Sequence, residues 1–259
     1  MSAKTALCAS VAVAVWMLDH AAAETRYWEV ETYGYYSSGD YGTDEKTEMI
    51  YWPLVVKHGS RSWRAVAIVP YLQVKSPGAQ AVVDGGVERI DEESSRETRS
   101  GLGDIVLKGT WHFKEQRELW PWMSAFVRVK LPTADEDKGL GTGETDVGFG
   151  LETVRMFPNR FLAFFDIGYT FIGEPSGVSY NDPLSISIGA GYQTLNQVLV
   201  AAFYEWREAI SPNNEDPQYL SFLGTYRVQR DWRVFAMLDL GLNDGAADFG
   251  VAAGLSRRL

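Results

Sequence analysis

The stretch GDIVLKGTWHF, at residues 103–113, decides the fold. Polar and apolar side chains alternate in it, and a period of two residues places them on opposite faces of a β-strand. Residues 184–193 and 232–242 repeat the alternation, again with one apolar side. Many strands of similar length, each apolar on one face only, are typical of a closed barrel in a membrane, with lipid outside and a polar lumen inside.

The alternation predicts about twelve strands along the chain. Their ranges are 26–37, 46–57, 62–74, 103–114, 120–131, 145–156, 161–172, 183–194, 197–208, 218–228, 231–242 and 248–259. Short connections such as 157–160 alternate with long ones such as 132–144. The sequence therefore predicts an all-β, transmembrane, antiparallel up-and-down β-barrel with short periplasmic turns and longer extracellular loops.

The first three strands are less regular than the others. Pro53 and Pro70 fall inside two of them, where each removes a donor from the ladder, and residues 50–56 are apolar on both faces. We expect either a bulge or apolar residues turned into the lumen. The connection 79–100 is long and acidic, and two interpretations stay open: it folds over or into the mouth, or it is a solvated loop.

The N-terminus has the features of a secretory signal. Lys4 supplies a positive charge, residues 6–18 are an apolar run, and residues 21–23 are three alanines, so we expect cleavage after Ala23. Two segments result, a signal peptide at 1–23 and one barrel domain at 24–259. The single cysteine, Cys8, lies in the signal, which leaves the mature chain without a disulfide or a thiolate metal site.

Composition narrows the partners. The net charge of the 259 residues is −10, which argues against nucleic acid, since nucleic acid selects basic surfaces. Acidic loops at an outer surface would bind divalent cations beside anionic lipid. The expected partners are outer-membrane lipid and lipopolysaccharide of a Gram-negative cell, the barrel assembly machinery and a small-molecule permeant.

Charged residues of both signs occupy the face predicted to line the lumen. The candidates are Asp104, Lys108, Arg128, Lys130, Asp146, Glu152, Asp166, Glu205, Arg207, Arg227, Arg233 and Asp239. Arg128 and Lys130 point to the same side as acids on the neighbouring strands, so opposite charges attract across the wall. They form either a constriction that orients a permeant or structural packing, and both interpretations stay open. Mixed signs argue against a filter for ions of one charge.

Six tryptophans lie near the short turns or open the first strand. They are Trp28, Trp63, Trp111, Trp120, Trp122 and Trp232. Indole rings favour the headgroup level of a bilayer, so this placement predicts an aromatic girdle around one rim.

Two segments resemble a known family. They are SGLGD at 100–104, and VRVKLPTAD at 127–135 followed by GLGTGETDVG at 139–148. The part from about residue 100 to 170 resembles the outer-membrane transporter family named for the meta-cleavage pathway of phenol degradation. The resemblance implies an outer-membrane barrel that passes small, often aromatic or hydrophobic, compounds. Barrels of this kind usually end in an aromatic residue, and Leu259 departs from that pattern.

The function that these features favour is a porin-like channel for passive uptake, without catalytic residues, cofactor or metal. One alternative is a structural or adhesion barrel with a filled lumen. Another is an outer-membrane lipid-modifying enzyme, which would need a base beside a nucleophile, and the mature chain offers only His58 and His112. Seven glycines predicted to face the lumen either widen it or help the wall to curve. They are Gly148, Gly150, Gly168, Gly189, Gly191, Gly250 and Gly254.

Overall fold

The computed structural model describes residues 26–42, 45–76, 80–83, 86–89, 97–118, 120–194, 197–212 and 214–259. The predicted signal peptide, with Cys8, lies outside these residues, as does much of the acidic connection 79–100. Regular structure in the described part of the chain consists of strands. No helix there is long and apolar enough to span a bilayer.

Fifteen strands follow one another in the described residues. They are β1 (Tyr27–Gly39), β2 (Thr47–Gly59), β3 (Trp63–Ser76), β4 (Gln80–Val83), β5 (Gly86–Arg89), β6 (Glu97–Leu102), β7 (Ile105–Lys114), β8 (Trp122–Leu131), β9 (Asp146–Met156), β10 (Phe161–Phe171), β11 (Leu184–Gln193), β12 (Val198–Arg207), β13 (Gln218–Arg227), β14 (Trp232–Gly241) and β15 (Phe249–Arg258). The expected strand ranges differ from the other strands by a few residues at their ends, whereas β4, β5 and β6 lie in a stretch that was expected to be a connection.

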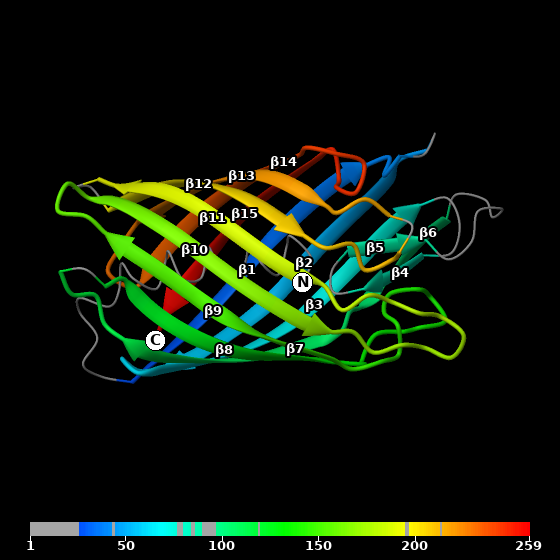
Figure 1. The fold of residues 1–259 in the computed structure, drawn as a ribbon, viewed down its shortest axis with the longest axis horizontal. Coiled ribbons are helices and arrows are strands. Elements are labelled where there is room, and N and C mark those ends of the chain that lie inside the picture. Colours follow the sequence, from blue (N-terminus) through cyan, green and yellow to red (C-terminus); the bar gives the residue numbers. More distant parts are fainter. Residues whose placement is uncertain are drawn as a thin grey trace.

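The strands close into a barrel, as Figure 1 shows. From β7 to β15, each strand pairs antiparallel with the strand that follows it in the sequence. The circle closes because β1 pairs with both β15 and β2, and β2 pairs with β3, which pairs with β7. Counting β6 and β7 as one strand, the barrel has twelve, which confirms the predicted fold.

The two ends of the barrel differ in their connections. One end carries short turns, at 60–62, 115–121, 157–160 and 228–231 among others, and the other carries longer loops, at 132–145, 172–183 and 208–217. The strand pairs alternate along the sequence, so β1 begins and β15 ends at the short-turn end (Figure 1). The predicted alternation of connection lengths is confirmed.

Residues 97–114 form one barrel strand that is interrupted by a bulge. β6 pairs with the second half of β3 and β7 with the first half. The partner of Leu102 is Tyr71 and the partner of Val106 is Ile68, so the strand carries one more residue than β3 between these pairs. The bulge falls at Gly103 and Asp104, and it turns the Asp104 side chain inward. The strand is thus longer than predicted, and residues 97–100 are wall of the barrel.

The prolines of β2 and β3 do not interrupt the wall. Pro53 lies opposite Pro70, and the register of the β2–β3 pair is continuous on both sides of them. Val55, Met49 and Leu72 are buried inside the barrel instead. Of the two expected outcomes, apolar residues turned into the lumen is the one that occurs in these strands.

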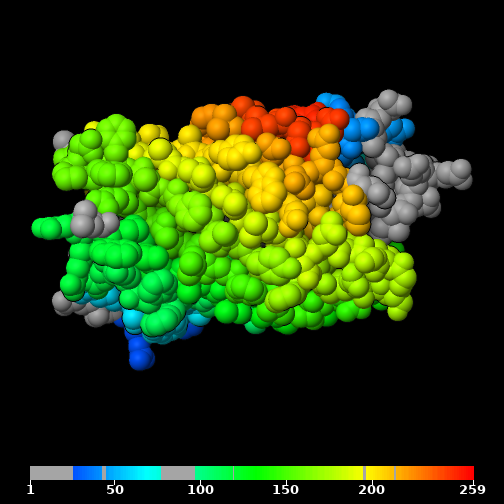
Figure 2. All heavy atoms as spheres, viewed as in Figure 1, coloured from blue at the N-terminus to red at the C-terminus, as the bar shows by residue number. Residues whose placement is uncertain are grey.

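The outer face is apolar. Large side chains that alternate with the lumen-facing ones are exposed, among them Leu107, Val127, Ile188 and Leu238. Figure 2 shows part of this wall over β8 to β13, in green through orange. Water would not stabilise such an extended apolar surface, whereas the hydrocarbon of a bilayer would.

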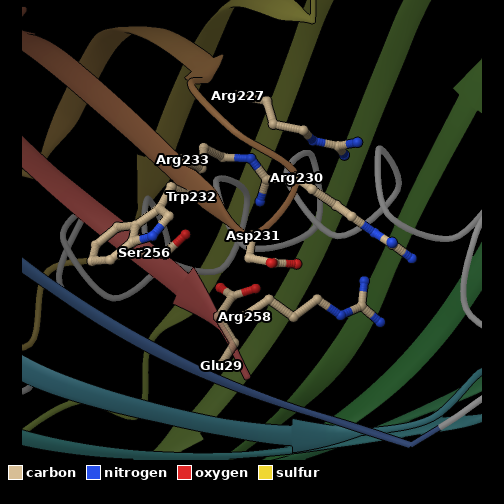
Figure 3. A pocket seen from close by; sticks show the side chains of 8 residues that line it. All are labelled: Glu29, Arg227, Arg230, Asp231, Trp232, Arg233, Ser256 and Arg258. Carbon is tan, nitrogen blue, oxygen red and sulfur yellow. The ribbon is translucent and has the colours of Figure 1, made fainter.

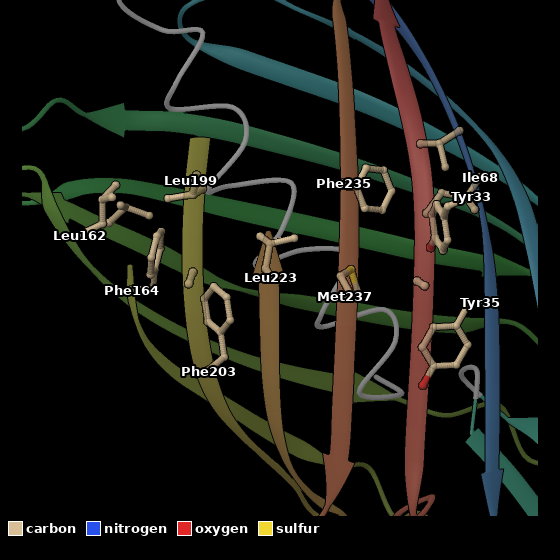
Figure 4. Packing of buried hydrophobic residues seen from close by; sticks show 14 of the residues in the cluster. Tyr33, Tyr35, Ile68, Leu162, Phe164, Leu199, Phe203, Leu223, Phe235 and Met237 are labelled. Carbon is tan, nitrogen blue, oxygen red and sulfur yellow. The ribbon is translucent and has the colours of Figure 1, made fainter. Parts of the chain in front are cut away.

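The inner face is more apolar than the polar lumen that the sequence predicts. A continuous cluster of buried apolar side chains lines it, including Phe164, Phe203, Phe235 and Tyr33 (Figure 4). The two-residue alternation correctly identified which side chains point inward, but it did not determine whether those side chains are polar or apolar. We refer to this cluster as the apolar belt. Its buried members are Tyr27, Tyr33, Tyr35, Val55, Ile68, Val154, Leu162, Phe164, Leu199, Ala201, Phe203, Leu223, Phe235, Met237 and Ala252.

Several lumen-facing glycines make room for the rings of the belt. A β-carbon on Gly189 would lie 2.3 Å from the Phe203 ring, and one on Gly254 would lie 2.7 Å from the Phe235 ring. Gly250 lies in the same way under Tyr35. These glycines therefore do not widen the lumen, because aromatic rings from neighbouring strands fill the space over them.

Candidate functional site

Three of the predicted lumen residues meet at the long-loop end. The Lys130 ammonium lies 2.9 Å from an Asp146 carboxylate oxygen and 3.4 Å from an Asp104 oxygen. All three side chains are buried. β8 supplies the lysine, β9 supplies Asp146, and the bulge before β7 supplies Asp104. Opposite charges on neighbouring strands therefore meet here, as the sequence predicted for Lys130.

This triad of Asp104, Lys130 and Asp146 fastens two loops to the wall. Asp104 accepts hydrogen bonds from the backbone N–H groups of Thr133 and Ala134, at 3.0 and 2.9 Å, in the loop 132–145. Asp146 accepts one from the N–H of Gly173, at 3.0 Å, in the loop 172–183. The arrangement is that of an anchor for the two loops, because the charged groups interact with one another and with backbone N–H groups of the loops.

The glycine-rich segment 139–143 carries a leucine into the barrel. Gly139 and Gly143 have φ angles of 62° and 70°, a region that side chains other than glycine rarely adopt. Between them Leu140 is 1% exposed and packs against Met49, Leu72 and Val74 of β2 and β3. The segment is therefore a tight turn that buries Leu140 at the long-loop end of the barrel.

A second charged group lies deeper in the wall. Glu152 on β9 accepts a short hydrogen bond from Lys108 and lies 3.7 Å from Arg64. The Lys108 ammonium also lies 4.2 Å from the centre of the Phe126 ring, a cation–π distance. Arg128 on β8 donates a hydrogen bond to the Thr170 hydroxyl of β10, across β9, at 3.2 Å.

A third group on the first two strands was missed from the sequence. Lys57 lies 2.9 Å from Glu29 and 2.7 Å from Glu31, and both contacts are largely shielded from solvent. Arg64, the partner of Glu152, was missed as well. The two-residue alternation, followed from Val55 to Lys57 in β2 and back from Ile68 to Arg64 in β3, would have placed both cations on the lumen face.

The remaining lumen candidates gather on β10 to β14. Glu205, Arg207 and Asp239 are buried, and Asp166 is partly buried. Arg227 and Arg233 lie directly opposite each other on β13 and β14, at the short-turn end. They line a small pocket with Glu29, Arg230, Asp231, Trp232, Ser256 and Arg258 (Figure 3).

The predicted tryptophan girdle is only partly placed on the outer face. Trp28, Trp111, Trp120 and Trp232 are exposed near the short turns, and Trp63 is half-buried there beside His58. Trp122 differs, because it shares the inward side of β8 with Ser124 and packs against the apolar belt. The physical reason is the two-residue period, because Trp122 shares a face with Ser124, Phe126 and Arg128 and points to the lumen with them.

The two histidines were the candidate bases of the enzyme alternative. His58 stacks on Trp28 with ring centres 4.2 Å apart. His112 contacts the Ser124 hydroxyl through Nδ1 at 2.7 Å, on the lumen side of the wall. In serine hydrolases Nε2 faces the nucleophile and Nδ1 faces an acid, so this pair has the opposite arrangement. Within the described residues, no group of side chains is placed to hold a metal ion.

Comparison with known proteins identifies the family. A model described as "Putative MetA-pathway of phenol degradation" matches residues 50–259. The chain belongs to this family. The match is wider than the segment from which the resemblance was drawn, and it includes nine complete barrel strands from β7 to β15. No curated protein sequence matches the chain.

Solved structures agree on the fold. An outer membrane channel from Pseudomonas putida F1 has a TM-score of 0.69 at 14% identity, over 90% of this chain and 95% of that one. The toluene transporter TodX of Pseudomonas putida has a TM-score of 0.42 at 12% identity, over 90% and 88% of the two chains. The first similarity shows the barrel fold, and the second is too low to support an argument. The closed barrel, its apolar outer face and the family place this protein in an outer membrane.

Proposed function

We propose that this member of the phenol-degradation family is a passive channel that takes up small hydrophobic or aromatic compounds across the outer membrane. The observation that carries the proposal is the apolar belt inside the barrel, which continues over nine strands. A porin for ions and sugars needs a wet, polar lumen, whereas a wall of Phe, Leu, Met and Tyr side chains favours apolar solutes.

The lumen charges support the same conclusion. Lys130, Glu152 and Lys57 each contact an oppositely charged side chain of the wall. A filter for ions of one sign needs a ring of unpaired charges of that sign. Charges engaged in this way stabilise the wall and leave selection to the apolar belt.

Export and surroundings complete the proposal. Cleavage after Ala23 would deliver the chain to the barrel assembly machinery. The exposed apolar side chains of the outer face would contact lipid and lipopolysaccharide. No step of uptake through such a channel requires catalysis or a cofactor, because the solute moves down its own gradient.

The test is conductance in planar bilayers with purified protein, together with swelling of proteoliposomes in a permeant solute. We expect single-channel currents, and we expect Phe203→Ala to increase them because Phe203 is buried in the belt. The matched control is Phe222→Ala, which removes an exposed ring from the outer face and should leave conductance unchanged. Absence of both current and swelling would contradict the channel.

A second candidate is a structural barrel with a filled lumen. The packing of Leu140 and of the belt side chains against one another favours it. The same experiment separates the two, because a filled barrel would stay silent in bilayers even when Phe203 is replaced by alanine.

A further inference from the structure

One lumen carboxylate differs from the others in its surroundings. Glu205 on β12 is 3% exposed, and neither of its carboxylate oxygens has a hydrogen-bond partner. Glu29 and Glu152, which are buried to the same degree, each accept a hydrogen bond from a lysine. Burial of a carboxylate without a partner is unfavourable, and such groups in native structures call for an explanation. A ligand that supplies a hydrogen bond would provide one.

Two hydroxyl groups on the neighbouring strand β13 are in the same condition. Ser221 and Thr225 on β13 are buried, and neither hydroxyl oxygen has a hydrogen-bond partner. Ser221 lies opposite Phe203, the residue two positions before Glu205 on the same face. Glu205 and Ser221 therefore lie close together on adjacent strands, and Thr225 lies further along β13 on the same face.

The same two strands present apolar side chains beside these polar atoms. Phe203 and Leu223 belong to the apolar belt and point into the barrel (Figure 4). Residues two apart on one strand face are separated by about 6.6 Å, which is comparable to the length of a benzene ring with one substituent. A ring lying on Phe203 would bring that substituent to Glu205.

The surrounding charges restrict what the substituent can be. Asp239 lies opposite Ser221 on β14, and Asp166 lies opposite Ser187, which is itself opposite Glu205. Acids on both sides disfavour an anionic group. A hydrogen-bond donor on an organic molecule suits this position, because carboxylate oxygens accept hydrogen bonds.

We propose that Glu205 is a specificity-determining residue that accepts a hydrogen bond from the hydroxyl or amino group of a small aromatic permeant whose ring lies on Phe203 and Leu223. Ser221 and Thr225 supply further hydrogen-bonding positions along the wall. The proposal rests on the proposed function and deepens it, because the apolar belt alone would not distinguish a donor-bearing aromatic from one without a donor.

The test uses blockade of the single-channel current of the full-length protein by two water-soluble aromatics. Catechol carries two hydroxyl donors, and 1,2-dimethoxybenzene has the same ring with both donors methylated. We expect catechol to block the wild-type channel about 10-fold more tightly, which corresponds to about 1.4 kcal/mol and to one net hydrogen bond. In Glu205→Met, which keeps the volume but not the acceptor, we expect that ratio to fall to about 1.

Two further variants protect the test. Glu215→Gln removes the same charge from an exposed position in the loop 208–217, and the ratio should stay at its wild-type value. If Glu205→Met fails to assemble, Glu205→Gln keeps a weaker, neutral acceptor, and the ratio should fall only in part. Equal blockade by both solutes in the wild-type channel, or an unchanged ratio in a folded Glu205 variant, would overturn the proposal. In either case currents would persist, whereas absence of all current would refute the channel itself.

Discussion

Replacing Lys130 by methionine tests whether the triad of Asp104, Lys130 and Asp146 is an anchor. The change keeps the length of the side chain and removes the cation that lies 2.9 Å from Asp146 and 3.4 Å from Asp104. Two buried carboxylates would then face each other without a counter-charge. Loss of one partner from a buried ion pair typically costs about 3–5 kcal/mol.

The structure places the cost at the lower end of that range. Asp104 would keep its hydrogen bonds from the N–H groups of Thr133 and Ala134, and Asp146 would keep the one from Gly173. We therefore expect a loss of about 3 kcal/mol, or roughly 100-fold in the folding equilibrium. Adding Asp146→Asn to Lys130→Met removes one of the two charges and should restore part of the stability.

The measurement is urea unfolding of the barrel in lipid vesicles, followed by tryptophan fluorescence and by the mobility of unheated samples on gels. Lys138→Met is the matched control, because Lys138 contacts Asp135 at 2.9 Å on an exposed turn of the same loop, where solvent screens the pair. If the unfolding midpoint of Lys130→Met equals that of the wild type and of Lys138→Met, the anchor interpretation is wrong.

Three further substitutions test other parts of the wall. Gly254→Ala places a β-carbon 2.7 Å from the Thr32 carbonyl oxygen and 2.7 Å from the Phe235 ring, so it should lower the free energy of unfolding by about 1–3 kcal/mol. Gly224→Ala, where the new β-carbon has no neighbour within 4 Å, should leave that free energy unchanged, and equal unfolding midpoints of the two variants would refute the close packing over Gly254. Leu140→Ala should loosen the loop 132–145 and increase its cleavage by an added protease, and an unchanged cleavage rate would show that the buried leucine does not hold the loop. Trp111→Phe should reduce the quenching of tryptophan fluorescence by brominated lipid, because Trp111 is exposed on the outer face. Trp122→Phe should leave the quenched fraction almost unchanged, and the reverse result would contradict the inward placement of Trp122.

The barrel itself was predictable because its rule is local. In residues 105–113 the inward and outward side chains alternate without interruption, and the same rule holds in β11 and β14. Closure then follows from physics, since a strand edge in hydrocarbon would leave backbone groups without partners. The bulge at Gly103 and Asp104 was not predictable, because an extra residue becomes visible only against the register of β3.

The candidate site was predictable in part. The sequence placed Asp104, Lys130 and Asp146 on one face of three neighbouring strands, and these three meet. It did not pair Arg128 with Thr170, because that contact crosses an intervening strand. Lys57 and Arg64 were missed where prolines and apolar residues obscure the period in β2 and β3.

By itself the sequence determined the number of strands, their order and the side of each that points inward, because a period of two residues is a property of the extended backbone alone. Which inward side chains meet was decided by the tertiary structure. The curvature and tilt of the wall bring residues from several strands together, so that Phe203 covers Gly189, Leu140 enters the mouth, and Glu205 is buried without a partner. Contacts of that kind depend on the radius of the closed barrel, and no segment of the chain carries that information alone.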